Sequence, residues 1–319
     1  MKRTIADGVW PTMVTPFTDD SGLDFGALEV MVEWYLARGV DGLFAVCQSS
    51  EMFTLTLPER VALAKGVVDL VDGRVEVIAS GHVSDALADQ VEEVRRIADT
   101  GVDAVVLVTN RFAQETEGDD VWIATLERFL EAVPDTFPLG FYECPYPYKR
   151  LLNPRLMAWC AATGRFIFLK DTCCDVGQMR AKLAVAGEIK LYNANAATLL
   201  ESLEAWTAEY QGAGGYRGAS GYSGVMGNFH PQLYAWLCRH WHEQAEAVRR
   251  LQAFLGVCSA IESRAYPVSA KYNLQLEGVP LTLQTRARPA SDLIYAFRRE
   301  VEQLRELTVE YDETFRLWP

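Results

Sequence analysis

The chain has 319 residues, of which 50% are hydrophobic and 23% are charged, so it is long enough to bury a large core. Its formal net charge of −13 argues against binding to nucleic acid or to an anionic membrane surface, and the basic residues do not gather in one run. No apolar segment follows the N-terminal Lys2 and Arg3, and no stretch approaches about 18 apolar residues. The sequence therefore predicts neither a secretory signal nor a membrane span.

The cysteines indicate a reducing compartment. There are seven of them, an odd number, and none forms a C-x-x-C pair. This usage is typical of reduced thiols, so we expect a cytoplasmic protein without disulfides or a metal site.

Strand-like apolar runs alternate with helix signals along most of the chain. The predicted strands cover residues 9–15, 42–47, 75–80, 104–109, 139–142, 166–170 and 189–193, with a weakly marked eighth strand inside 212–227. The predicted helices cover 25–38, a segment that begins at Thr56, 84–100, 119–132, 154–162, 175–186 and 203–210. Eight strand–helix units predict an α/β protein of the (β/α)8 TIM barrel class. An open doubly wound sheet is the competing architecture, but no G-x-G-x-x-G follows the first strand.

The pattern changes to helices alone after about residue 229. These helices are expected at 231–255, 258–278 and 290–307, and no Pro/Gly/Ser-rich linker precedes them. We therefore predict two parts. Residues 1–228 form the barrel with the active site, and residues 229–319 form a C-terminal helical extension packed on it.

Chemically competent side chains gather at the carboxyl ends of the predicted strands, which in a barrel face one pocket. Lys170 ends the sixth strand, Tyr142 ends the fifth, and Gln48, Ser49 and Ser50 follow the second. Alone, each has an ordinary explanation: a lysine that snorkels to the rim, a core tyrosine, and a helix-capping turn. Together they supply an amine nucleophile, a proton donor and hydrogen-bond donors for a carboxylate, which is what imine formation with a 2-keto acid requires.

Other residues at the strand ends are weaker candidates. His82 follows the third strand and Phe112 the fourth, while Gly221 lies near the eighth, and we place all three among the candidate substrate-binding residues. The cations Arg111, Lys149 and Arg150 lie in neighbouring loops, and the sequence leaves open whether they contact substrate or solvent.

Several motifs recur in order along the chain. They are Gly8-Val-Trp-Pro-Thr-Met-Val-Thr-Pro-Phe17, Cys47-Gln-Ser-Ser-Glu51, Tyr142-Glu-Cys-Pro145, Leu169-Lys-Asp-Thr172 and Tyr266-Pro-Val-Ser-Ala-Lys271. In this respect the chain resembles the dihydrodipicolinate synthase and N-acetylneuraminate lyase superfamily, which are Schiff-base-forming class I aldolases acting on pyruvate-type substrates. The resemblance implies that Lys170 forms the imine, that Tyr142 relays protons, and that Ser49 with the amide of Ser50 holds the substrate carboxylate.

Departures from the superfamily pattern surround the lysine. Cys47, Gln48 and Ser50 replace residues of the G-[ST]-T-G-E loop, and Phe112 stands where synthases have a tyrosine that reaches into a neighbouring subunit. The arginine that synthases place after Y-x-x-P has no clear counterpart. The resemblance thus implies a lyase acting on a 2-keto acid, for which we expect a 2-keto-3-deoxy sugar acid cleaved to pyruvate and an aldehyde.

Two alternatives stay open at this point. One is a dehydratase or condensing synthase that uses the same imine, and the other is a keto-acid-binding protein with little or no turnover. In each case we expect no cofactor other than the covalent lysine imine. The resemblance also implies a homo-oligomer, either a dimer or a tetramer.

Overall fold

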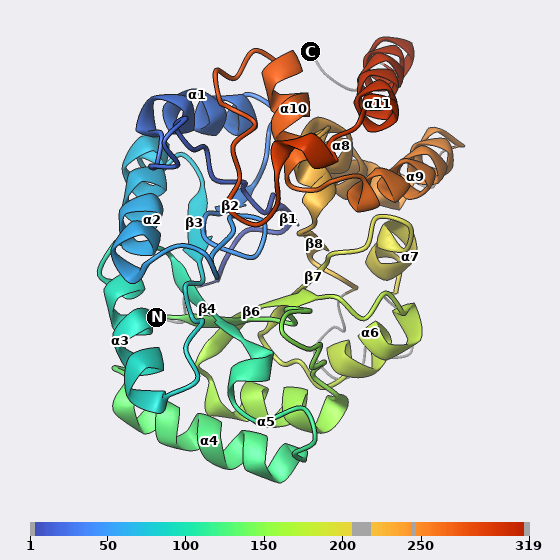
Figure 1. Cartoon of the computed structure of the whole chain (residues 1–319). Coiled ribbons are helices and arrows are strands. Elements are labelled where there is room, and N and C mark those ends of the chain that lie inside the picture. Colours follow the sequence, from blue (N-terminus) through green and yellow to red (C-terminus); the bar gives the residue numbers. More distant parts are fainter. Residues whose placement is uncertain (1–3, 206–217, 244–245, 316–319) are drawn as a thin grey trace.

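The protein is an eight-stranded parallel barrel wrapped by helices, seen in a computed structural model that describes residues 4–205, 218–243 and 246–315 (Figure 1). The strands are β1 (Gly8–Val9), β2 (Gly42–Phe44), β3 (Glu76–Ala79), β4 (Ala104–Val108), β5 (Leu139–Tyr142), β6 (Phe166–Asp171), β7 (Lys190–Asn193) and β8 (Gly221–Tyr222). Their order is β1-β8-β7-β6-β5-β4-β3-β2, and every neighbouring pair is parallel. The predicted (β/α)8 architecture is confirmed.

The barrel closes between its first and second strands through irregular backbone. Thr12 forms an isolated parallel bridge with Phe44, so the chain after β1 lies beside β2. The predicted first strand, 9–15, is shortened to Gly8–Val9 because Pro11 has no N–H to donate to a ladder. On the other side, a Cβ at Gly221 would lie 1.8 Å from the carbonyl oxygen of Gly8, so only glycine allows β1 and β8 to meet.

Helices surround the strands in Figure 1. They are α1 (Phe25–Leu36), α2 (Leu57–Val71), α3 (Leu87–Ala98), α4 (Asp119–Ala132), α5 (Pro154–Thr163), α6 (Val176–Leu183) and α7 (Leu199–Leu203). The expected start near Thr56 is a capping box with Glu59, which satisfies two backbone N–H groups at the beginning of α2. The predicted helix 203–210 lies largely outside the described residues, and α7 precedes it.

The C-terminal region is helical, as expected, and its helices lie together in the upper part of Figure 1. They are α8 (Pro231–His240), α9 (Glu246–Cys258), α10 (Val268–Leu276) and α11 (Tyr295–Phe315), with short 3-10 helices η3 (Val225–Asn228), η4 (Trp241–Glu243), η5 (Ser259–Ser263) and η6 (Ala290–Asp292). Helix α8 packs against β1, whereas α9 packs against α7. The division of the chain at residue 228 stays a prediction.

All three helices predicted for this region were wrong in extent: the third, 290–307, is η6 followed by the longer α11, and the other two are interrupted. The segment 231–255 is interrupted by η4, because its two halves pack on different neighbours. The segment 258–278 is broken before α10, where Ala265 has a φ of 54° and Pro267 cannot continue a helix. This break matters because it places residues 259–267 over the mouth of the barrel.

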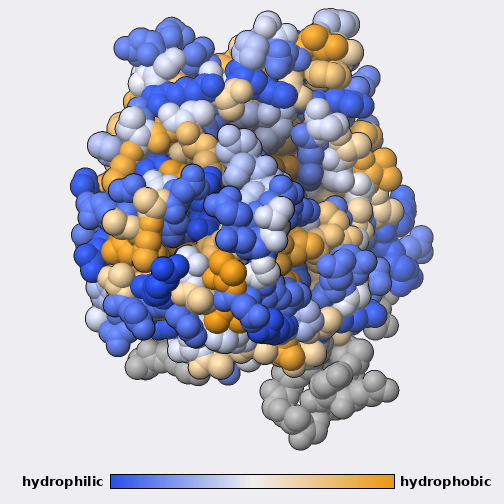
Figure 2. Space-filling model, turned by 60° about the horizontal axis from the view of Figure 1, so that its bottom comes forward, coloured by the Kyte–Doolittle hydropathy of each residue, from blue (hydrophilic) through white to orange (hydrophobic). Residues whose placement is uncertain are grey.

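The barrel interior is filled by aromatic rings. Phe168 packs with its ring centroid 6.1 Å from Trp10, 6.1 Å from Phe44 and 4.8 Å from Tyr192. This dry layer lies beneath the strand ends. On the outer face shown in Figure 2, hydrophilic and hydrophobic residues are interspersed. Within the described residues no helix is long and apolar enough to cross a membrane.

Candidate active site

Lys170 lies near the end of β6, and its side chain is only 4% exposed. In the sheet register it pairs with Tyr142 of β5 on one side and Tyr192 of β7 on the other. Its Nζ lies 4.6 Å from the ring centroid of Tyr142 and 6.0 Å from that of Phe44. Burial lowers the pKa of the Lys170 amine, which raises the fraction of the neutral form that can attack a carbonyl.

Tyr142 ends β5, and its hydroxyl donates a hydrogen bond of 3.1 Å to Oε1 of Gln48. The Cys144 thiol lies 3.5 Å from the same oxygen. Burial raises the pKa of Tyr142 well above its ordinary value, so the phenol stays protonated at neutral pH. Tyr142 is therefore placed as a hydrogen-bond donor beside the amine.

A cavity of about 390 Å³ opens above Lys170, large enough for a small acid. It is lined by Gln48, Ser49, Glu51, Tyr142, Pro145, Lys149, Lys170, Thr172, Cys174, Ala194, Asn195, Gly224, Val225, Glu262, Tyr266, Pro267 and Ala287. Residues of β5 and β6, of the loops after β2, β7 and β8, and of the C-terminal region thus meet at one place. The strand ends form most of the wall and the segment 262–267 forms the rest.

The loop after β2 presents some of its predicted residues to the cavity and turns others away. Gln48 and Ser49 line the cavity, and the Ser49 hydroxyl donates to Oγ1 of Thr12 at 3.1 Å. The Ser50 hydroxyl lies 2.6 Å from the carbonyl oxygen of Met13, and its backbone N–H donates to the carbonyl of Cys47. Ser50 therefore holds the loop in shape, and its amide is already engaged within the loop.

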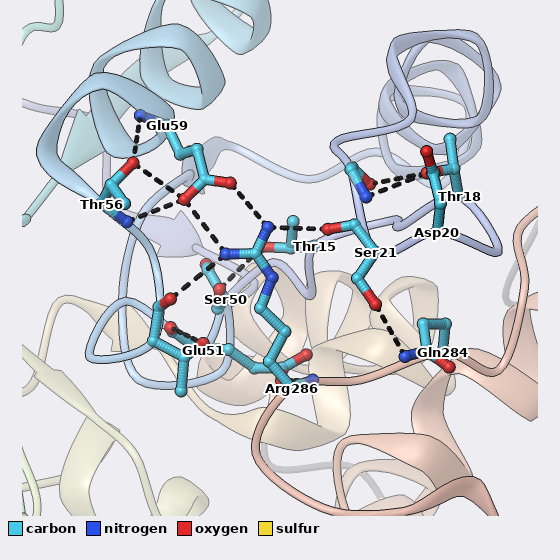
Figure 3. A network of polar contacts seen from close by, with 12 residues as sticks. Thr15, Thr18, Asp20, Ser21, Ser50, Glu51, Thr56, Glu59, Gln284 and Arg286 are labelled. Atoms are coloured by element: carbon cyan, nitrogen blue, oxygen red, sulfur yellow. Dashed lines mark hydrogen bonds and ion pairs between the residues drawn. The ribbon is translucent and has the colours of Figure 1, made fainter.

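A second set of contacts fixes this loop to the C-terminal region, as Figure 3 shows. The backbone N–H groups of Arg286 and Ala287 donate to Oε2 of Glu51 at 2.6 and 2.7 Å. The Arg286 guanidinium makes a two-pronged contact with the Glu59 carboxylate, at 2.6 and 3.0 Å, and donates to the carbonyl of Ser21. Because Glu51 is 4% exposed, the loop and the extension are tied together inside the protein.

His82, Phe112 and Gly221 do not appear among the described residues that line the cavity. The rings of His82 and Phe112 stack at a centroid distance of 5.1 Å, and both side chains are fully buried between β4 and α4. Nδ1 of His82 accepts a hydrogen bond from the Val108 N–H, and Gly221 serves the β1–β8 junction. The structure thus gives these three residues packing positions in place of the expected substrate contacts.

The three loop cations have different surroundings. Arg111 pairs with Asp85 at 2.6 Å, and Arg150 donates to the carbonyls of Gln114 and Glu117. Lys149 does line the cavity, where its Nζ donates to the carbonyl of Thr172. Of these cations the structure places only Lys149 at the cavity wall.

A buried ion cluster supports the two strands that carry Tyr142 and Lys170. Lys182 of α6 lies 2.6 Å from carboxylate oxygens of both Glu143 and Asp171, the residues that directly follow Tyr142 and Lys170. Burial, with the nearby charge of Asp171, raises the pKa of Glu143 to about 7, although the Lys182 ammonium opposes this shift. The cluster fixes the ends of β5 and β6 relative to each other from behind.

Sequence reasoning missed two polar residues of the cavity. Tyr266 was noted within the Tyr266-Pro-Val-Ser-Ala-Lys271 motif without a role, yet its hydroxyl lies 3.2 Å from Nδ2 of Asn228 and its side chain lines the cavity. Glu262 carried no signal, since it was expected within a helix remote from the strand ends. A proline after an aromatic residue inside a predicted helix was the one available indication of a turn there.

A (β/α)8 barrel with a buried lysine at the end of its sixth strand is the arrangement expected of an enzyme that forms a lysine imine. Comparisons with known proteins identify the family. The family model described as the dihydrodipicolinate synthetase family matches residues 6–305. The chain belongs to this family and is an enzyme of it, of the Schiff-base, pyruvate-dependent aldolase and synthase type.

Similar individual proteins agree with this assignment. A 4-hydroxy-tetrahydrodipicolinate synthase of Saccharophagus degradans is 29% identical over 284 residues, covering 86% of this chain and 92% of the relative. A dihydrodipicolinate synthase from Bacillus anthracis has the same fold, with a TM-score of 0.83, 19% identity and coverage of 95% of this chain and 99% of that one. The Acinetobacter baumannii synthase solved with pyruvate has a TM-score of 0.81 at 22% identity, with coverage of 95% and 99%.

Proposed function

We propose that this enzyme is a lyase that forms an imine between Lys170 and a 2-keto acid, and that its substrate is a 2-keto-3-deoxy sugar acid cleaved to pyruvate and an aldehyde. The observation that carries the proposal is the buried Lys170 amine with its lowered pKa, facing a cavity beside the Tyr142 hydroxyl. Ser49 supplies a hydroxyl for the substrate carboxylate, and Tyr142 donates to the carbinolamine oxygen as water leaves. The reaction needs no metal or cofactor, because the imine itself withdraws electrons.

The cavity favours a substrate whose distal end is neutral over one with a second carboxylate. Arg150 is tied to backbone carbonyls, and Lys149 is the one cation besides Lys170 among the described lining residues. The Glu262 side chain brings partial negative charge to the wall, whereas the charge of Glu51 is offset by the Lys271 ammonium at 3.6 Å. A hydroxylated chain fits such a wall better than an anionic one.

Trapping with borohydride tests the imine. Pyruvate and sodium borohydride should together leave a reduced adduct on Lys170, located by peptide mass spectrometry, and Lys170→Ala should leave none. Absence of an adduct at Lys170 in the wild-type protein would refute the proposed function. The matched control is Lys149→Ala, which keeps the nucleophile.

Turnover separates the remaining alternatives. Assays against a panel of 2-keto-3-deoxy sugar acids should show pyruvate release, while a binding protein would trap pyruvate and convert nothing. The curated relatives named as synthases motivate one more assay, condensation of pyruvate with aspartate semialdehyde, which should be slow because no arginine lines the described cavity wall. We also propose a homo-oligomer, a dimer or tetramer, which light scattering measures.

A further inference from the structure

Glu262 is an acidic side chain on the cavity wall that the imine chemistry proposed above does not use. It comes from η5 of the C-terminal region and lines the same cavity as the residues at the strand ends. Its Oε1 is buried, and no described residue lies within hydrogen-bonding distance of it. Buried polar atoms are almost always paired, so an unpaired carboxylate oxygen on a side chain that lines a cavity marks Glu262 as a candidate functional group.

The charged and titratable groups around Glu262 come from several elements. Lys170 of β6 interacts electrostatically with it. The charge of Glu262 adds to the effect of burial in raising the pKa of the hydroxyls of Tyr222 in β8 and Tyr234 in α8. Elsewhere on the wall, Lys149 donates to a backbone carbonyl and Glu51 accepts from two backbone amides. Glu262 and Lys170 therefore line the same cavity and interact electrostatically there.

Burial raises the pKa of Glu262 to about 7, although the Lys170 charge acts in the opposite direction. A carboxyl group with this pKa is present in both protonation states at neutral pH, which suits a group that takes up and returns a proton. The pKa shift follows from the position of the side chain, because its burial at the cavity wall removes it from water.

Tyr142 is poorly arranged for the same task. Its hydroxyl donates to Oε1 of Gln48, and an amide oxygen cannot pass a proton onward. Its pKa lies well above the ordinary value, so the phenolate that would act as a base is scarce at neutral pH. Glu262 is a second titratable group on the wall of the same cavity.

We infer that Glu262 is a catalytic residue, the acid and base that moves protons at C3 and at the C4 hydroxyl of the 2-keto acid bound to Lys170. The inference rests on the proposed lysine imine and adds a role that the family resemblance does not assign to this position. Tyr142 then acts at C2, during formation and hydrolysis of the imine, and Glu262 acts on the carbons beyond it.

Protons and electrons balance over one cleavage of the C3–C4 bond. The Glu262 carboxylate takes the proton of the C4 hydroxyl, the C4–O bond becomes a carbonyl, and the C3–C4 bond breaks. The electron pair of that bond forms C2=C3, while the imine π pair moves to the Lys170 nitrogen and gives an enamine. Glu262 then returns its proton to C3, and water hydrolyses the resulting iminium to pyruvate and the free lysine.

Exchange of the pyruvate methyl protons tests this role without knowledge of the full substrate. The iminium of pyruvate loses and regains a C3 proton through the same enamine, so wild-type protein in D2O should deuterate pyruvate, as followed by proton NMR. Glu262→Gln should slow this exchange by about 100-fold or more, the usual range for loss of a general acid–base. The wild-type exchange rate should rise with pH through an inflection near neutrality, and the residual rate of Glu262→Gln should lack that inflection.

Borohydride trapping of pyruvate separates this role from folding and from the imine itself. Glu262→Gln should still form the Lys170 adduct, and Glu262→Asp should recover part of the exchange. The matched control is Glu300→Gln, which removes a half-exposed carboxylate paired with Arg264 of the same region and should exchange at the wild-type rate.

The outcomes are distinct. Wild-type exchange rates in Glu262→Gln, or loss of trapping together with exchange, would overturn the role of Glu262. No trapping in the wild-type protein would instead overturn the proposed function.

Discussion

The two walls of the cavity differ in how their side chains are held. On the barrel wall, Tyr142 and Lys170 are neighbours in a sheet register, and the buried cluster around Lys182 supports them from behind. On the other wall, Glu262 comes from the short 3-10 helix η5 and Tyr266 from the turn after it, where the Tyr266 hydroxyl contacts Asn228 of η3. The difference indicates that Lys170 is held by the sheet and the buried ion cluster, whereas Glu262 depends on how the C-terminal region docks.

Loss of the cation behind the barrel wall should have the largest effect on stability. Lys182→Met leaves the carboxyls of Glu143 and Asp171, both 0% exposed, facing each other without a counter-charge. The free energy of unfolding should fall by about 3–5 kcal/mol at pH 7, measured by urea denaturation. The deficit should shrink towards pH 5, because protonation of Glu143 relieves the repulsion and the pKa of this group is already raised to about 7.

Lys65→Met is the matched control for that variant. Lys65 pairs with Asp69 one helical turn away on the surface, and removal of this pair should cost no more than about 0.5 kcal/mol. If both variants lost the same stability, the cluster behind the barrel wall would have no special role.

Loss of the Arg286 contacts, which tie the C-terminal region to the barrel, should lower the free energy of unfolding by less. Arg286→Met removes the contacts of the guanidinium with Glu59 and with the carbonyl of Ser21, for an expected loss of about 1–3 kcal/mol. The Arg286 hydrogen bond is the main cause that holds the pKa of Glu59 down to about 2. A lowered folded-state pKa stabilises above the unfolded value of 4.5, so the wild-type advantage should decline as pH falls from 5 towards 2.

This variant also tests the independence of the two walls. Lys170 should still be trapped with pyruvate in Arg286→Met, because its position depends on β5, β6 and the Lys182 cluster. Arg299→Met, which removes a surface pair with Glu302, serves as the control and should leave stability nearly unchanged. Loss of trapping in Arg286→Met alone would show that the barrel wall depends on the docked extension.

Glu262→Gln should change the free energy of unfolding in the opposite direction. The raised pKa of about 7 means that the ionised side chain is disfavoured in the folded protein relative to the unfolded chain, where the value is 4.5. This penalty is complete above pH 7 and disappears below pH 4.5, so the variant should be more stable than wild type by about 1–3 kcal/mol at pH 8 and equal to it at pH 4.5. Equal stability at pH 8 would contradict the buried, ionised state.

The sequence predicted those features that depend on residues close together in the chain. The run 166–170 predicted a strand buried on both faces, and β6 covers Phe166–Asp171 with Lys170 near its end. Helix starts such as Thr56 follow from capping chemistry within four residues, and the barrel follows from the repeated alternation. These features depend on hydrogen bonds and burial between near neighbours or between repeated units.

Side-chain direction was the information that local sequence lacked. His82, Phe112 and Ser50 follow strands just as Gln48 does, yet the first two pack into the protein, and the third bonds to the Met13 carbonyl and within its own loop. Which face a residue presents after a strand ends is set by the loop that follows, and no periodicity describes such a loop.

The family, the barrel and the position of Lys170 at a strand end were therefore accessible from residue order, because motif spacing and strand periodicity are local properties. The opposite wall was decided by tertiary structure. Glu262 reaches the cavity because the chain turns at Ala265 and Pro267, and because Arg286 and Glu51 join the C-terminal region to the loop after β2. Contacts over more than 200 residues of separation, such as that of Arg286 with Glu51, leave no mark in the local pattern.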